Sequence, residues 1–113
     1  MDIVIRTLGD NLKLLKIRGR ITLGLGVDRL RDTLQDLLVA GSNQWVLDIS
    51  DVAMIDSSGI GLLVRYLTAA KQQGGALKLL NPTKFAMQSL KMIGLLNLFE
   101  VYDDQETALS SFK

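Results

Sequence analysis

The fold is decided by residues 45–75, which read WVLDISDVAMIDSSGIGLLVRYLTAAKQQGG. The apolar run from Gln44 to Ile49 predicts a strand buried in the centre of a sheet, and Val52 to Ile55 continues it toward a turn. A helix is expected from about Ser58 to Gln73, because apolar residues recur there at helical spacing, at Ile60, Leu63, Val64, Leu67 and Ala70. Gly74 and Gly75 end that helix, so the stretch predicts one strand–turn–helix unit.

The segments on both sides carry the same two kinds of pattern. Two apolar runs around the turn Gly9-Asp10-Asn11 indicate an opening hairpin, and strand and helix patterns alternate after it. The other expected strands are 2–8, 12–18, 77–80 and 98–102, and the other expected helices are 27–40, 81–93 and 103–112. In the helix that begins at Asn81-Pro82, the expected buried stripe is Phe85, Ala86, Ser89, Leu90 and Ile93.

The predicted element order is therefore β-β-α-β-α-β-α-β-α. Alternation after the hairpin implies parallel strands joined by right-handed crossovers. We expect residues 1–113 to form a single α/β domain, with a mixed, mainly parallel sheet of four to five strands and about four helices.

The composition restricts the possible functions. The 113 residues are 48% apolar and carry a formal net charge of +1, so no broad positive field attracts nucleic acid or an anionic membrane. Cysteine and histidine are absent from the sequence, which excludes disulfides, the usual zinc sites and a Ser-His-Asp triad. We therefore expect a binding module rather than an enzyme, with no cofactor and no metal.

The apolar runs are short. None approaches the roughly 20 residues of a membrane span, and the N-terminus lacks the basic-then-apolar plan of a signal peptide. The expected compartment is the cytosol, without membrane insertion.

The turn Asp56-Ser57-Ser58-Gly59 is the strongest candidate site. It lies where a parallel strand passes into a helix, and helix N-termini offer free N–H groups that favour negative charge. This position suits a serine that contacts an anion or accepts a phosphate. A purely structural alternative remains open: Ser57 caps the helix, while Gly59 and Gly61 permit close packing. Residue types alone favour this alternative by about two to one.

Three weaker candidates have two interpretations each. The carboxylates Asp48, Asp51 and Asp56 are either ligands for a divalent cation or turn residues at a strand end. Arg18 and Arg20 either contact phosphate or lie on a solvated strand face. An apolar stretch either packs in the core or binds a partner, and it comprises Met87, Met92, Leu95, Leu96 and Leu98.

The residues around the turn resemble the signature of STAS domains, in particular bacterial anti-sigma factor antagonists. The resemblance covers nearly the whole chain and rests on Val46-Leu47-Asp48-Ile49, on 52–63, on 74–79 and on 98–102. It implies binding to a cognate anti-sigma factor serine kinase, which releases the sigma factor and permits transcription. It also implies inactivation by serine phosphorylation, which a PP2C-type phosphatase reverses.

The resemblance also implies roles for single residues. Ser57, directly after the motif aspartate, corresponds to the phosphate acceptor, and Asp56 shapes the acceptor site. Ser58, Gly59 and Ile60 complete the expected partner-binding surface. One departure is visible: many family members have an acidic residue in the loop after the second strand, and residues 19–23 offer none. The alternative function is a non-regulatory STAS adaptor or scaffold subunit, for example of a lipid-transport complex.

Overall fold

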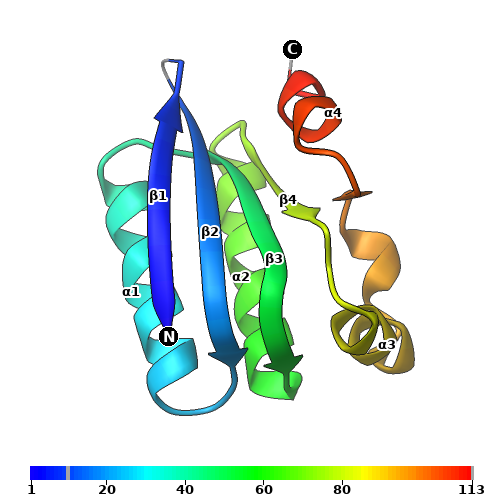
Figure 1. Cartoon of the computed structure of the whole chain (residues 1–113). Coiled ribbons are helices and arrows are strands. Elements are labelled where there is room, and N and C mark those ends of the chain that lie inside the picture. Colours follow the sequence, from blue (N-terminus) through cyan, green and yellow to red (C-terminus); the bar gives the residue numbers. More distant parts are fainter. Residues whose placement is uncertain (10, 113) are drawn as a thin grey trace.

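The computed structural model describes residues 1–9 and 11–112, so Asp10 of the expected first turn lies outside the described part. The elements, shown in Figure 1, are β1 (Asp2–Leu8), β2 (Leu12–Ile21), α1 (Leu25–Val39), β3 (Gln44–Ile55), α2 (Ser57–Gln72), β4 (Ala76–Leu80), α3 (Lys84–Ile93), a 3-10 helix (Leu96–Leu98), β5 (Val101–Tyr102) and α4 (Gln105–Ser110). They form one five-stranded sheet in the order β1-β2-β3-β4-β5. The predicted fold class and element order are confirmed.

The sheet is mixed, as expected. β1 pairs antiparallel with β2, and every later neighbour pair is parallel. β3 is central. Its side chains alternate between the two faces, and Trp45, Val46 and Leu47 are all buried, whereas from Ser50 to Ile55 only Val52 and Ile55 are buried. The pairing of β2 with β3 shifts register between Lys16 and Arg18 and again between Gly19 and Arg20, which breaks the alternation there.

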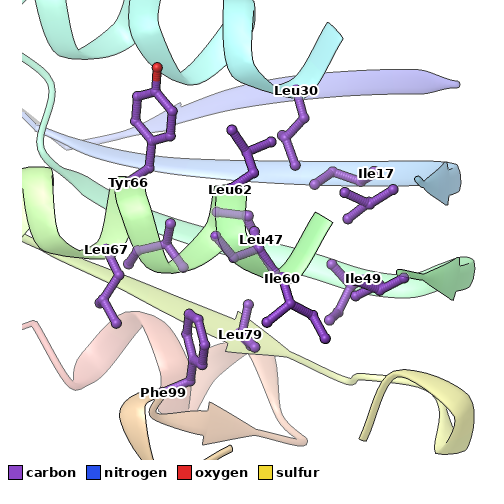
Figure 2. Close-up of a cluster of buried hydrophobic side chains, with 14 of the residues drawn as sticks. Ile17, Leu30, Leu47, Ile49, Ile60, Leu62, Tyr66, Leu67, Leu79 and Phe99 are labelled. Carbon is purple, nitrogen blue, oxygen red and sulfur yellow. The ribbon is translucent and has the colours of Figure 1, made fainter. Parts of the chain in front are cut away.

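The main core lies between one face of the sheet and three helices. Figure 2 shows side chains of the helices and strands gathered in this layer, among them Leu30, Tyr66, Leu67 and Leu47. α1 and α2 lie side by side behind the strands (Figure 1), and α3 adds Ala86 and Leu90 to the same cluster. Because these core side chains are almost completely removed from water, this layer holds α2 against the sheet.

A smaller core lies on the other face of the sheet. Leu14, Val46 and Leu80 alternate along their strands with main-core residues, so they point the opposite way. They pack against Ala108 of α4, and the C-terminal helix therefore covers a separate corner of the sheet.

Several boundary predictions were wrong by two or three residues, including the end of β2, which is at Ile21, and the bounds of α4, which are Gln105–Ser110. The helix expected from Asn81 begins at Lys84, because Asn81 takes a left-handed conformation (φ 51°) and the Thr83 side chain caps the helix by accepting from the Ala86 N–H. The helix expected from Val27 begins at Leu25. The last strand is only Val101–Tyr102, because the chain before it winds into a 3-10 turn.

The predicted stripe of α3 was partly wrong. Ala86 and Leu90 are buried, but Phe85 is 71% exposed and Ile93 is also exposed. The helix is ten residues long and buries only one narrow line of side chains. Within residues 1–9 and 11–112, no helix is both long enough and apolar enough to cross a membrane.

Candidate functional site

The candidate site is the junction of β3 and α2. β3 ends at Ile55 and α2 starts at Ser57, with Asp56 between them as the N-cap residue. Figure 1 shows the start of α2 directly beside the arrowhead of β3. The turn therefore lies at the carboxyl edge of the parallel strands, as the sequence predicts.

Asp56 holds two segments together through its two carboxylate oxygens. Oδ1 accepts a hydrogen bond from the Gly59 N–H at 2.9 Å, which caps α2. Oδ2 accepts from the Leu23 N–H at 2.9 Å, and Leu23 belongs to the loop between β2 and α1. One side chain thus determines both the helix start and the position of the neighbouring loop.

The same contacts set the charge state of Asp56. The Leu23 N–H lowers the pKa of this carboxyl below its usual 3.8, burial opposes this shift, and the N–H groups of Gly59 and Ser58 lower it further. Asp56 is therefore a carboxylate at neutral pH. It places a fixed negative charge next to Ser57.

Ser57 is the first residue of α2 and its side chain is exposed. The cap of the helix is Asp56, so the structural alternative in which Ser57 serves as the cap is wrong. Within the described part of the chain, neither the Ser57 nor the Ser58 hydroxyl forms a hydrogen bond, and Ser58 is half-buried. The Ser57 hydroxyl is therefore free to meet another molecule.

The next two residues face inward. Ile60 is 1% exposed and belongs to the main core, so its side chain does not reach a partner, which corrects the expectation made for it. Gly59 is buried as well, and a Cβ added there would stand 2.1 Å from the Ile21 carbonyl oxygen. Close packing of α2 on β2 therefore requires this glycine, and the exposed part of the site consists of Asp56, Ser57 and Ser58.

Two exposed leucines that sequence reasoning missed lie in the loop held by Asp56 and at the first position of α1. Leu23 is 77% exposed and Leu25 is 88% exposed, on either side of Gly24. Residues 19–26 contain three glycines, so the sequence indicates a loop there. The overlooked signal was the presence of large apolar residues in a loop that has neither strand nor helix periodicity.

The weaker candidates do not assemble into a second site. The Asp51 carboxylate lies 3.9 Å from Lys16 Nζ and 4.0 Å from Arg18 Nε, and Asp48 accepts from the neighbouring Ser50. The residues that the structure describes contain no group of three carboxylates able to hold a metal ion. Arg20 is exposed on β2, which agrees with a solvated strand face.

The apolar residues of α3 and of the segment after it lie partly against the core and partly on the surface. Met87, Leu95 and Leu96 are partly covered, whereas Met92 and Leu98 are exposed. A surface cavity of about 550 Å³ lies elsewhere, between Met1 and α1. None of its lining residues belongs to the start of α2, so Ser57 is displayed on the surface and not within that cavity.

Known proteins share this architecture. The family model described as "Mlab, STAS domain" matches residues 7–100. An anti-sigma factor antagonist homologue assigned in Thermotoga neapolitana is 31% identical over 74 residues, which span 66% of this chain and 66% of that protein. The chain thus spans just under two thirds of that relative's length.

Three solved structures have the same fold. The crystal structure of a Thermotoga maritima protein assigned as an anti-sigma factor antagonist superposes with a TM-score of 0.89 at 22% identity, covering 97% of this chain and 93% of that one. The anti-sigma factor antagonist SpoIIAA, unphosphorylated, superposes with a TM-score of 0.83 at 16% identity, over 97% and 95%. The phosphorylated form of SpoIIAA, from Bacillus, gives 0.77 at 17% identity, over 99% and 100%.

The fold, the strand–turn–helix site and the family match over most of its length lead to one assignment. The chain belongs to the STAS domain family.

Proposed function

We propose that this STAS domain is an anti-sigma factor antagonist that works by partner switching. In this proposal the surface around Ser57 binds an anti-sigma factor that is a serine kinase, and the sigma factor is released. The kinase inactivates the antagonist by phosphorylating Ser57, and a PP2C-type phosphatase restores it. The observation that carries the proposal is the Ser57 hydroxyl, which is exposed at the first residue of α2 and forms no hydrogen bond with the described residues.

The relatives support this role. The homologous Thermotoga protein and the structural relative SpoIIAA are both named anti-sigma factor antagonists, and SpoIIAA exists in phosphorylated and unphosphorylated forms. In this chain the acceptor would be held by the same helix start that Asp56 caps.

Electrostatics explain how a phosphate would act as a switch. A phosphate adds about −1.5 to −2 charges at neutral pH, next to the Asp56 carboxylate. The α2 dipole returns only about 0.3–1 kcal/mol, and Ser57 is exposed, so the fold itself tolerates the charge. Inside a desolvated interface an unpaired charge costs roughly 2–5 kcal/mol, which weakens affinity by about 30-fold to several thousand-fold.

The acceptor is tested by phosphorylation mapping. The protein is incubated with ATP and an anti-sigma factor serine kinase from the same organism, and the modified residue is located by mass spectrometry. We expect phosphate on Ser57 in the wild type and in Ser58→Ala, and none in Ser57→Ala. Phosphate on Ser58 alone, or none on the wild type, would contradict the proposed switch.

The charge mechanism is tested by binding. Ser57→Asp adds a negative charge, and Ser57→Asn is the matched control because it has nearly the same size without the charge. We expect Asp to lower affinity for the kinase by at least about tenfold relative to Asn, while Ser57→Ala binds like the wild type. Equal affinity of the Asp and Asn variants would remove the charge from the mechanism.

A second candidate follows from the description of the matching family model, which names Mlab and not an anti-sigma factor antagonist. This candidate is an unmodified STAS adaptor or scaffold subunit, for example of a lipid-transport complex. It predicts co-purification with a membrane ATPase in place of a kinase. Affinity purification of the wild type followed by identification of the bound protein separates the two candidates.

A further inference from the structure

The fold requires a glycine at one of two positions in α2 and not at the other. Gly59 is required inside the molecule, because a Cβ there would stand 2.1 Å from a backbone carbonyl oxygen of β2. Gly61 has no such neighbour: a Cβ added there meets nothing within 4 Å. Its φ also lies outside the left-handed region that favours glycine. Neither space nor backbone conformation within the described chain explains Gly61.

Glycine at position 61 weakens the helix that contains it. A glycine inside an exposed helix is less favourable than alanine by about 0.5–1 kcal/mol, because it loses more backbone entropy on folding. Gly61 is exposed and lies well inside α2, so this cost applies in full. Packing with other described residues offers no compensation for it.

The position of Gly61 on α2 suggests what compensates for this loss of helix stability. It follows Ser57 by four residues, so it lies on the same side of the helix, about 6 Å further along the axis. The residues between them that face the core are buried, whereas Ser57 and Gly61 are both exposed. Gly61 therefore leaves bare backbone on the surface immediately beside the serine.

We propose that Gly61 is a specificity-determining residue for the phosphorylation of Ser57, and this inference rests on the proposed function. The missing side chain lets the surface of the anti-sigma factor kinase lie directly against the α2 backbone, so that Ser57 reaches the transferred phosphate. A side chain at 61 would hold the two proteins apart. Reacting atoms must come within about 3–3.5 Å, and a displacement of about 1 Å can slow a reaction by about 100-fold.

The test compares stability with phosphorylation in the same variants. Gly61→Ala should melt about 2–5 °C higher than the wild type, because the helix loses its glycine. Its phosphorylation rate by the kinase should nevertheless fall by about tenfold or more. Gly61→Gln carries a larger side chain of good helix propensity and should fall by about 100-fold.

A matched control lies on the same helix. Thr68 is exposed and two turns beyond Gly61, away from the serine, so Thr68→Ala should keep the wild-type phosphorylation rate. It separates a general change of α2 from a local obstruction next to Ser57. A loss of rate in Thr68→Ala equal to that in Gly61→Ala would overturn the inference.

The remaining outcomes are decisive in different ways. If the wild type is phosphorylated at Ser57 and Gly61→Gln is phosphorylated equally fast, the inference fails and the proposed function stands. If Gly61→Ala melts lower than the wild type, the fold itself needs this glycine and the inference fails. If wild-type Ser57 takes no phosphate, the proposed function fails, and the inference that rests on it fails as well.

Discussion

The inner and outer sides of the first turns of α2 differ in what determines their residues. On the inner side, Gly59 and Ile60 are buried against the sheet, and the contacts with β2 explain both residue types. On the outer side, Ser57 and Gly61 are exposed, and the described contacts require neither of them. The comparison shows that folding explains the inner residues, while it leaves the outer residues exposed for the binding that we propose.

The largest effect on stability is expected from a substitution on the inner side of α2. Gly59→Ala forces a Cβ against the Ile21 carbonyl oxygen, so α2 must move away from β2. We expect a loss of about 3 kcal/mol in the free energy of unfolding, measured by urea denaturation. Gly61→Ala makes the same chemical change two residues away and should be stabilising. Equal stability of the two variants would refute the distinction between the two sides.

The next effect concerns the residue that joins the two sides. Asp56→Ala removes the cap of α2 and the bond to the Leu23 N–H, and we expect a loss of about 1–2 kcal/mol. Asp104→Ala is the control, because Asp104 caps α4 through the Thr107 N–H. It should cost less, since that cap belongs to a helix of only six residues. A larger loss for Asp104→Ala would contradict the linking role of Asp56.

A smaller effect appears in acid. The hydrogen bond from Leu23 lowers the folded-state pKa of Asp56 below 3.8, so its contribution to stability is present above that value and is lost as the pH falls through the lower folded-state pKa. The stability of the wild type should therefore decline more steeply than that of Asp56→Asn below about pH 4. Urea unfolding at a series of pH values measures both slopes, and parallel curves would show that Asp56 has an ordinary pKa.

The smallest effect concerns the outer side. Ser57→Ala removes an exposed hydroxyl without a described partner, so the free energy of unfolding should change by no more than about 0.5 kcal/mol. Thermal unfolding measures this directly. A loss above about 1 kcal/mol would mean that Ser57 supports the fold and would weaken its assignment to binding.

Much of the fold was predictable because it follows from local patterns. The apolar run from Trp45 to Ile49 and the helical spacing after Ile60 each bury one side of a segment, and both elements formed as expected. The prediction for α3 was wrong at Asn81, because local capping signals compete there, and at Phe85, because the helix buries only Ala86 and Leu90. The hydroxyl of Thr83, which also donates to the Val52 carbonyl oxygen, provided the cap that forms.

The sequence by itself determined the order of the elements and the place of Ser57 at the start of a helix, because periodicity and turn residues act over a few neighbours. Only the tertiary structure decided that Asp56 caps α2 while it holds Leu23, and that Gly59 is required inside whereas Gly61 is not. These distinctions depend on atoms of β2 and its loop, more than thirty residues earlier in the chain. No local pattern reports such distances, so only the folded chain separates the residues required inside from those left exposed.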